Sequence, residues 1–487
     1  MRPRCALVGQ REKRQIAGAQ ARAWLHRHLL AVASAGFVLL ALPVVWRGAP
    51  LADDFANCLR PAQDGLGTTL ADSWDRLGAI RPARFLEILL THGVCERLPF
   101  GFAIAVPLAL TLAVAWLLRG LLRDLRFAAP WPDVAGTVWL LQPLGTEAAL
   151  WPAALHVPLG LALALGSLRL LRRGRWAWGV LAAAGAFGSA EQTILALPVA
   201  AWVTGPSQHR RKGSLLILGL VAALGLAVLV FPGEDQRLQA GLVERLTALL
   251  DDPAFYVQFP AVGLGLHSIP LALWWALPWS LLALAAGAVA GGWLAAHPGG
   301  STGIGLRLPT IREAATAVAL LAAINGPVLA NVPRQGSPRV FTPTWLLVAA
   351  LVAVVFSQTH LRRPHLAGSV AGLLAAGAVL SLTLSVSVRL DSADAVELAA
   401  HQVAARAGDG ADVAVCEVPR AVTEPAPRGA FAVNDFLYDW AATDAVAYHT
   451  GQAVTVQVFT DECPTGAETS ADLVASFSQL TDLRQGR

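Results

Sequence analysis

Charged side chains are scarce in this sequence, and their scarcity decides its class. Asp, Glu, Lys and Arg make up 14% of the 487 residues, whereas hydrophobic residues make up 55%. A water-soluble protein of this size could not bury so much apolar surface, so the composition excludes one and indicates a polytopic membrane protein. The net charge of +4 is also too small to indicate nucleic-acid binding. Lysine is nearly absent, with only Lys13 and Lys212, which indicates a coding bias rather than a function.

Several common catalytic signatures are lacking as well. The sequence contains no nucleophile elbow, no phosphate-binding loop and no metal-ligand spacing. It also contains no evident internal repeat. These absences exclude the enzyme classes that such motifs define, so any chemistry must come from residues that the fold brings together.

Apolar runs that suit a bilayer recur along the chain. A helix needs about 20 residues to cross a hydrocarbon core of about 30 Å. The first run, 29–46, follows a polar and basic segment, 1–28, and no small-residue cleavage site follows it. These features predict an uncleaved transmembrane span with a cytoplasmic tail. Further runs lie at 100–119, 132–150, 153–171, 176–190, 193–205, 214–231, 266–296, 312–331, 343–359 and 366–388. The prediction is an all-α polytopic membrane bundle of about eleven transmembrane helices, in which 176–190 and 193–205 either cross fully or form a buried hairpin.

Arginines in the loops give the expected orientation. From a cytoplasmic N-terminus, every second loop is short and basic, whereas the loops near Glu147 and Glu191 contain no Lys or Arg. By the positive-inside rule the basic loops are cytoplasmic, which predicts a multi-pass protein of the cell membrane. The basic loops contain Arg119, Arg123 and Arg126; Arg172, Arg173 and Arg175; Arg210, Arg211 and Lys212; Arg307 and Arg312; and Arg362 and Arg363.

The five cysteines divide between the two predicted sides. Cys58 and Cys95 fall in the first outside loop, 47–99, and Cys416 and Cys463 fall in the C-terminal segment. Cys5 alone falls in the cytoplasmic tail. Paired thiols on the oxidising side predict two disulfides, with four unrelated free thiols as the alternative.

The composition changes sharply after residue 390. Residues 391–487 hold 15 acidic residues against five arginines. The alternating runs 413–418 and 453–459 predict strands, and the spacing in 392–406 predicts a helix. The domain organisation expected is therefore a tail at 1–28, a transmembrane domain at 29–390 and a small extracytoplasmic α+β domain at 391–487.

Asp53 and Asp54 stand directly after the first apolar run. Adjacent carboxylates at a membrane edge are costly to hold unless they accept a proton, bind a metal or bind a polar substrate. The loop that follows has the spacing of amphipathic helices that lie on the membrane surface or cap the bundle. The pair is therefore predicted to be a reaction centre, and the sequence does not distinguish the roles of its two members.

Four arginines are candidates for binding phosphate at the same outer level. Arg81 and Arg84 lie beside a predicted helix start in the first outside loop, and a guanidinium can bind phosphate bidentately. Arg334 and Arg339 lie in a short Pro- and Gly-rich loop that is basic although it is predicted to be outside. For Arg81 and Arg84 the alternative is an ion pair with Asp72 or Asp75 or contact with lipid headgroups. For Arg334 and Arg339 the alternative is contact with lipid headgroups.

Other polar residues are predicted at this level. Glu147 lies in an apolar context beside Trp151, whose ring could pack on a sugar, and the alternative is a carboxylate that reaches the headgroups. Glu191 and Gln192 could bind hydroxyl groups, or could form only a polar helix turn. His156 is a further candidate, although a hydrogen-bonded structural histidine is favoured there.

These groups share the outer boundary, while the helix interiors carry almost no ionisable residues. A transporter usually places its polar site near the midplane, so this distribution favours chemistry at one face. The chain resembles the type-C glycosyltransferases in Asp53-Asp54-Phe55 after the first span, in Arg81-Pro82 within a large outside loop, in the level of Glu147 and in Pro338-Arg339. The resemblance extends to about residue 390. A Gly-Arg pair often found in such loops is not intact, because two residues separate Gly78 from Arg81.

The resemblance implies an inverting transfer of a sugar from a polyprenyl-phosphate donor to a glycan or lipid acceptor of the cell envelope. Asp53 or Asp54 would act as the general base, and Arg339 with Arg81 or Arg84 would stabilise the leaving phosphate. Some relatives bind a divalent cation, such as Mg²⁺, Mn²⁺ or Ca²⁺, which the acidic pair could help to hold. The competing hypotheses are a transporter or flippase of lipid-linked glycans and a non-catalytic envelope assembly protein.

Overall fold

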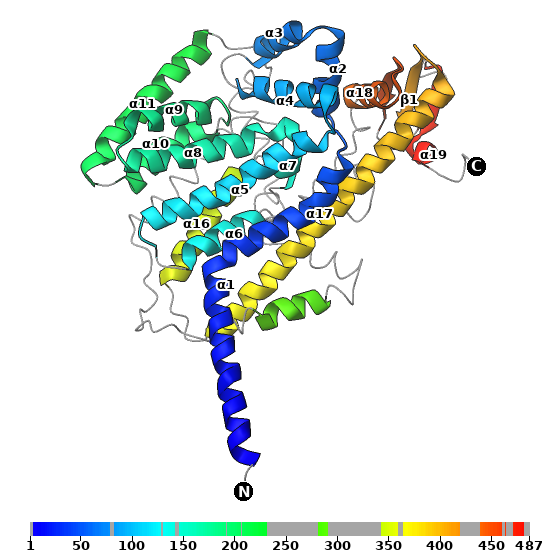
Figure 1. The fold of residues 1–487 in the computed structure, drawn as a ribbon. Coiled ribbons are helices and arrows are strands. Elements are labelled where there is room, and N and C mark those ends of the chain that lie inside the picture. The colour runs from blue at the N-terminus through cyan, green and yellow to red at the C-terminus, as the bar shows by residue number, and fades with distance from the viewer. Residues whose placement is uncertain are drawn as a thin grey trace.

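The computed structural model describes residues 3–77, 82–127, 130–141, 146–190, 192–205, 207–230, 281–290, 342–358, 364–418, 439–459, 463 and 471–481, and most of them are helical (Figure 1). The labelled helices are α1 (Pro3–Arg47), α2 (Asp53–Gln63), α3 (Leu66–Leu77), α4 (Ala83–Arg97), α5 (Gly101–Asp124), α6 (Trp131–Leu141), α7 (Thr146–Leu150), η3 (Pro152–Ala154), α8 (His156–Arg172), α9 (Trp176–Phe187), α10 (Gln192–Thr204), α11 (Ser207–Val230), α16 (Thr342–Gln358), α17 (Pro364–Ala407), α18 (Asp439–Thr450) and α19 (Phe477–Thr481). The strands are β1 (Asp412–Cys416), β2 (Thr455–Val458) and β3 (Leu473–Ser476).

Among the described residues, four helical stretches are long and apolar enough to cross a membrane: Arg27–Arg47, Gly101–Asp124, Pro152–Arg172 and Ser369–Ala407. They correspond to four of the predicted runs. The predicted run 132–150 is divided between α6 and α7, and the run 312–331 lies outside the described residues. The described residues therefore show a helical bundle with four membrane-length helices, and the predicted total of about eleven is not shown.

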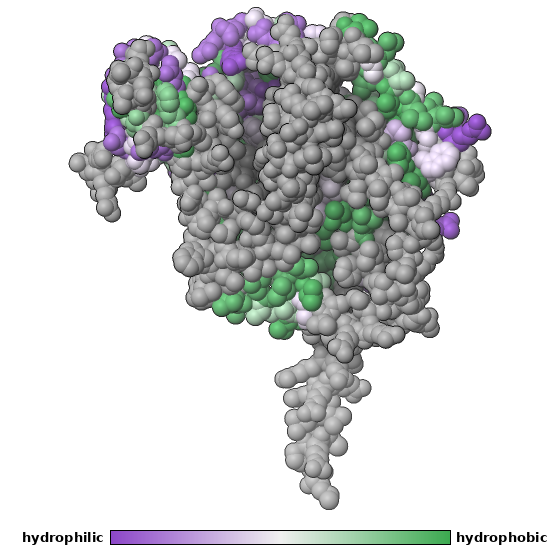
Figure 2. Space-filling model, turned by 180° about the vertical axis from the view of Figure 1, so that it is seen from behind, coloured by the Kyte–Doolittle hydropathy of each residue, from purple (hydrophilic) through white to green (hydrophobic). Residues whose placement is uncertain are grey.

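The long helices expose apolar side chains along their outer surfaces. Leu39 on α1 is 68% exposed, Trp178 on α9 65% and Leu226 on α11 64%. Figure 2 shows hydrophobic surface over α11 and over the short helix at 281–290, and hydrophilic surface over α3 and the C-terminal unit. Apolar surface of this extent fits contact with lipid chains rather than with water.

Charged residues collect at one end of the bundle. Arg119 Nε lies 2.8 Å from the Asp133 carboxylate, and Arg169 Nε lies 2.8 Å from that of Asp124. Arg173 also reaches Asp124, at 3.4 Å. The first two predicted basic loops therefore meet at one level. His156 lies at the opposite end of α8, which has 17 residues and a length of about 25 Å.

The end of α1 and the start of α5 approach each other closely. A Cβ added at Gly101, the first residue of α5, would clash with the backbone oxygen of Val45. Only glycine allows so short a distance between two backbones. The chain then turns at Gly48 (φ 59°) and enters α2, so the crossing of α1 and α5 fixes the place where α2 begins.

The C-terminal unit contains a three-stranded parallel sheet with the order β2-β1-β3. The predicted strands at 413–418 and 453–459 are confirmed as β1 and β2, and β3 was not predicted. Because the strands are parallel and α18 lies between β1 and β2 in the chain, the arrangement is α/β, which corrects the α+β expectation. The predicted domain boundary at 390 falls inside α17, which runs on without a break into the core of this unit.

Both predicted disulfides are present. Cys58 and Cys95 join α2 to α4 with a Cα–Cα distance of 5.8 Å, and Cys416 and Cys463 are joined at 4.9 Å. Disulfides persist in oxidising compartments, so the two bonds are compatible with an extracytoplasmic location of the segments that carry them.

Candidate functional site

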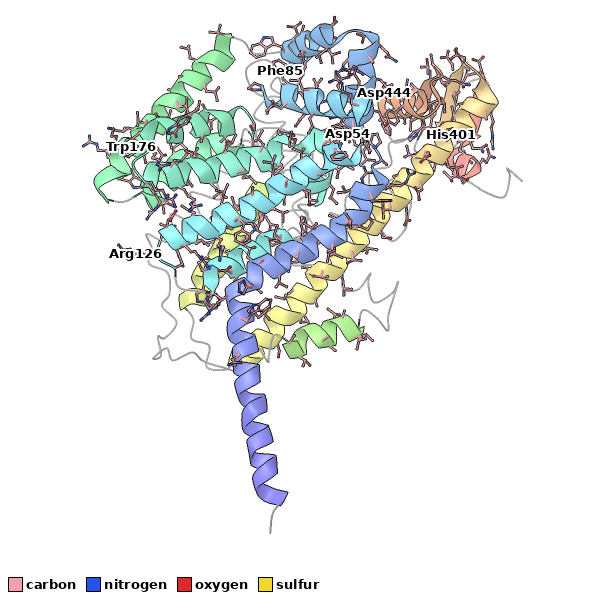
Figure 3. The ribbon with its side chains drawn as sticks, viewed as in Figure 1. Asp54, Phe85, Arg126, Trp176, His401 and Asp444 are labelled. Atoms are coloured by element: carbon pink, nitrogen blue, oxygen red, sulfur yellow. A yellow bond between two sulfur atoms is a disulfide. The ribbon has the colours of Figure 1, made fainter. Side chains whose placement is uncertain are left out.

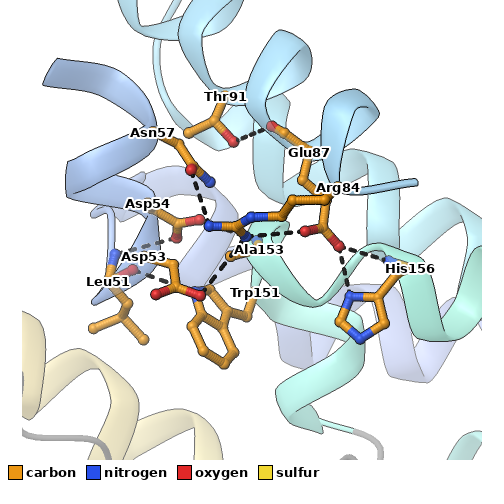
Figure 4. A network of polar contacts seen from close by, with 10 residues as sticks. All are labelled: Leu51, Asp53, Asp54, Asn57, Arg84, Glu87, Thr91, Trp151, Ala153 and His156. Atoms are coloured by element: carbon orange, nitrogen blue, oxygen red, sulfur yellow. Dashed lines mark hydrogen bonds and ion pairs between the residues drawn. The ribbon is translucent and has the colours of Figure 1, made fainter. Parts of the chain in front are cut away.

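Asp53 and Asp54 are the first two residues of α2, where the N-terminal end of the helix dipole favours negative charge. Ala52, just before them, has φ of 41°, a conformation that costs energy for a residue with a Cβ. The Asp54 side chain is fully buried, and its two oxygens accept hydrogen bonds from the backbone N–H groups of Leu51 at 3.2 Å and Ala153 at 3.0 Å. Asp54 thus joins the turn after α1 to η3 and is closed to any substrate (Figure 4).

The buried Asp54 carboxyl also has an altered affinity for protons. Burial raises its pKa well above the ordinary value of 3.8, and the negative charge of Asp53 adds to the shift. The two backbone N–H groups and the positive charge of Arg389 act in the opposite direction and offset it only in part. Arg389 is a buried residue of α17 that donates a hydrogen bond to the backbone oxygen of Ala49 at 2.9 Å, at the same turn.

Asp53 is the accessible member of the pair. Its side chain is 36% exposed, and one of its oxygens lies 3.6 Å from Nη1 of Arg84 on α4. This distance is longer than a normal charge-assisted hydrogen bond, so the contact is a weak ion pair that a ligand could replace. The two adjacent carboxylates therefore differ completely in environment.

The Arg84 guanidinium is held by two further groups. It donates to an oxygen of Glu87 at 3.0 Å and to Oδ1 of Asn57 at 3.1 Å (Figure 4). Burial lowers the pKa of Arg84, but the charges of Asp53 and Glu87 outweigh burial and raise it. Arg84 is thus a fixed cation, and the disulfide between α2 and α4 helps to keep it beside Asp53.

Glu87 is the buried anion of this network, with a side chain only 1% exposed. Its other oxygen accepts a hydrogen bond from the backbone N–H of His156 at 3.0 Å. The same oxygen lies 2.6 Å from Nδ1 of the His156 ring. Burial alone would raise the pKa of Glu87, but the charges and hydrogen bonds of His156 and Arg84 outweigh it and lower the pKa to about 2. Glu87 therefore connects α4 to α8 and orients Arg84.

The start of α4 is also fixed from the side of α9. The backbone N–H of Ala83 donates to the oxygen of Gly188 at 3.0 Å, and the ring of Pro82 lies over the same glycine. A Cβ added at Gly188 would lie 2.8 Å from Cγ of Pro82, which is too close for a rigid ring. The glycine therefore permits the approach that places Arg84.

Replacing Gly188 by alanine is expected to push the start of α4 away from α9 and to displace Arg84. Overpacking of this kind costs about 1–3 kcal/mol of stability. Thermal unfolding of the purified protein in detergent measures this loss. The control is Gly166→Ala in α8, where nothing lies within 4 Å of an added Cβ and where alanine should be neutral or slightly stabilising. Equal effects of the two changes would contradict this account of α4.

The structure brings several of the predicted site residues together. Asp53, Asp54, Arg84 and His156 all belong to one network (Figure 4). His156 is buried and paired with Glu87, which fits the structural role that was favoured for it. Trp151 is only 6% exposed, and its Nε1 donates to the backbone oxygen of Leu51 at 3.2 Å, so its ring is packed in the protein and does not form an open face for a sugar.

Other predicted residues lie outside what the structure describes. Arg81, Glu191, Arg334 and Arg339 are not among the described residues. Glu147 in α7 and Gln192 in α10 are described in their backbone only. The predicted contribution of these residues to the site therefore stays a prediction.

The acidic pair does not suit a divalent cation. Both oxygens of Asp54 already accept backbone hydrogen bonds, so only Asp53 could offer a ligand atom. Among the described residues there is also no group of three or more His, Cys, Asp or Glu side chains arranged to hold a metal ion.

Three residues of the network were not predicted from the sequence: Asn57, Glu87 and Arg389. Asn57 lies one turn after Asp53 on α2, and Glu87 lies on the buried side of α4 with Ile88. A carboxylate on an apolar helix stripe, three residues after an arginine, is a signal that could have found Glu87. Arg389 directly follows a predicted apolar run, where an arginine is unusual.

Comparisons with known proteins add no family to this description. No protein-family model, no curated protein and no solved structure matches the chain.

Proposed function

We propose that this chain is a membrane glycosyltransferase that moves a sugar from a polyprenyl-phosphate donor to a glycan or lipid acceptor outside the cell. The observation that carries the proposal is the pairing of Asp53 with Arg84 where the first membrane-length helix ends. A carboxylate that can accept a proton and a cation that can bind phosphate are the two groups that such a transfer needs.

The difference in exposure supports different roles for the two acids. Asp53 is 36% exposed and can meet an acceptor hydroxyl, whereas the buried Asp54 is committed to two backbone N–H groups. Asp53 is therefore the general base, and Asp54 positions it by fixing the start of α2.

Binding of the donor would change the Asp53–Arg84 pair. A lipid phosphate is a stronger partner for a guanidinium than a carboxylate 3.6 Å away. Once Arg84 binds the phosphate, Asp53 is released to take the proton of the acceptor hydroxyl as that oxygen attacks the anomeric carbon. The bond between that carbon and the phosphate oxygen breaks, and Arg84, held by Glu87 and Asn57, stabilises the departing charge.

The surroundings of the site fit a lipid-linked donor. Trp46 at the end of α1 is 88% exposed, and Phe102 at the start of α5 is 57% exposed. Both belong to the region where α1 and α5 cross, which is close in space to the start of α2. Apolar side chains at this level could contact a polyprenyl chain while its phosphate reaches Arg84. The Cys58–Cys95 disulfide lies on the same two helices as the pair and supports an extracytoplasmic site.

The test is to reconstitute the purified protein in lipid and to supply a panel of polyprenyl-phosphate sugars with simple glycoside acceptors. Release of the lipid phosphate together with a glycoside of inverted anomeric configuration is expected for at least one donor. A protein that moves intact lipid-linked glycans across the bilayer without releasing phosphate would be a transporter instead. An assembly protein would show neither activity.

A further inference from the structure

A basic cluster lies at the end of the bundle opposite to the acidic pair. Figure 3 shows Trp176 at this end, whereas Asp54 lies near the other end of α8. Two helix junctions meet there, the one between α8 and α9 and the one between α10 and α11. Arg172 at the end of α8 connects them to α5, because it donates hydrogen bonds to the backbone oxygens of Thr204 and of Asp124.

The charge at this end is strongly positive. Residues 156–231 contain one acidic residue, Glu191, which lies in the chain between α9 and α10 and so belongs to the other end of both helices. Asp124 of α5 contacts the cluster, but Arg169 and Arg173 already pair with it at 2.8 Å and 3.4 Å. The exposed cations that form no ion pair with the residues that the structure describes are Arg175, Arg211 and Lys212.

A narrow crevice opens between the four helices of the cluster. Its lining includes Arg172, Trp176 and Gly213, one each from α8, α9 and α11. The free volume is about 10 Å³, which is space for one small group such as a phosphate oxygen. Nζ of Lys212 lies 5.4 Å from the centre of the Trp176 ring, and this cation–π contact holds the ammonium group beside the crevice. A larger anionic group would therefore lie at the mouth, against the exposed cations.

Apolar surface adjoins the crevice on the same helix ends. Trp178 near the start of α9 is 65% exposed, Trp202 near the end of α10 is 47% exposed, and Leu215 near the start of α11 is 56% exposed. Figure 2 shows that hydrophobic surface continues over α11. Tryptophans beside cations at helix ends are typical of the boundary between a membrane and water. A ligand with both a phosphate and acyl chains matches this combination, whereas a soluble phosphate compound would leave the apolar surface uncovered.

We propose that the crevice between α8, α9, α10 and α11 binds the headgroup of an anionic phospholipid. Basic pockets between membrane helices suit such headgroups, and each nearby Lys or Arg strengthens the attraction roughly fivefold. Lys212 contacts the phosphate at the mouth, over the positive charge of Arg172, and the acyl chains lie on the exposed apolar side chains of α10 and α11. The predicted orientation places this lipid in the cytoplasmic leaflet. The inference does not depend on sugar transfer, because the site and the acidic pair lie at opposite ends of α8.

The test measures the binding of a fluorescent phosphatidylglycerol to the purified full-length chain in detergent. Binding should saturate, and unlabelled phosphatidylglycerol should compete while phosphatidylcholine and glycerol phosphate compete far less. Lys212→Gln should weaken binding about fivefold, and Lys212→Gln combined with Arg175→Gln roughly 25-fold. Lys212→Arg keeps the charge and should restore most of the affinity. The control is Arg97→Gln, an exposed arginine at the end of α4, which should leave the affinity unchanged.

Three results would overturn the lipid site. Equal competition by phosphatidylcholine would show that the surface does not select for negative charge. Equal competition by glycerol phosphate would identify a soluble phosphate ligand instead of a lipid. Wild-type affinity in the double variant, folded as judged by size-exclusion chromatography, would show that these cations do not bind the headgroup. If the double variant does not fold, wild-type affinity in Lys212→Gln alone overturns the proposal in the same way.

Discussion

Asp53→Asn is expected to lower the rate of sugar transfer by about 10²–10⁴-fold, the usual contribution of a general base. The amide cannot accept the proton of the acceptor hydroxyl, although it has the size and shape of the carboxylate. Because Asp53 is partly exposed and its ion pair with Arg84 is long, the free energy of unfolding should change by less than about 1 kcal/mol. The measurement is transfer per folded molecule, together with thermal unfolding of the same preparation.

Asp54→Asn is the matched control, one residue away. An asparagine can accept the hydrogen bond from Leu51 or from Ala153 with its oxygen, but its NH₂ group then faces the other N–H. This change should cost about 1–3 kcal/mol of stability. Because one backbone hydrogen bond still fixes the start of α2, the folded molecules should lose much less activity than those of Asp53→Asn. If Asp54→Asn folds like the wild type but loses transfer, and Asp53→Asn does not, the assignment of the base is wrong.

Glu87→Gln is expected to give the largest loss of stability. The change leaves Arg84 and His156 without the buried anion that both contact. Breaking a buried ion pair by removing one partner typically costs about 3–5 kcal/mol. Arg84 would also lose a hydrogen bond that orients it, so the KM for the donor should rise. Thermal unfolding in detergent and the donor KM measure the two effects separately.

The pH dependence of stability tests the same residue in the wild type. The pKa of Glu87 is lowered from 4.5 to about 2, so its contribution is fully present above pH 4.5 and is lost as the pH falls toward 2. A shift of this size corresponds to about 3 kcal/mol. Glu87→Gln should remove this part of the acid dependence. The control is Glu96→Gln in the same helix, which is 46% exposed and should change stability by less than about 0.5 kcal/mol. If the two variants behave alike, Glu87 does not hold the network.

The sequence predicts much of the framework because its signals are local. Hydrophobic runs mark α1, α5, α8 and α17, and alternation marks β1 and β2. The two cysteine pairs could be assigned because each pair lies within one predicted outside segment. The length of α17 could not be predicted, since its last part differs in composition from the apolar run before it although the helix continues through the change.

The candidate site was predictable only in part, because its contacts join distant segments. The Asp-Asp motif identifies Asp53 and Asp54 as candidates, and the first outside loop identifies Arg84. Neither signal shows that Asp54 bonds to the backbone of Ala153, 99 residues away. Glu87 is hidden for the same reason, because its partner His156 lies 69 residues further along the chain. Burial separates the roles of two adjacent aspartates, and burial is a property of the fold.

The central claim is that the network around Asp53 lies on the extracytoplasmic side of the membrane, and labelling of single cysteines tests it directly. Asp64→Cys, exposed just after α2, and Arg175→Cys, exposed just before α9, are each made in a Cys5→Ser background and treated with a membrane-impermeant maleimide. The account predicts that intact cells label Asp64→Cys and that Arg175→Cys is labelled only after permeabilisation. The reverse pattern would place the site in the cytoplasm and contradict the account.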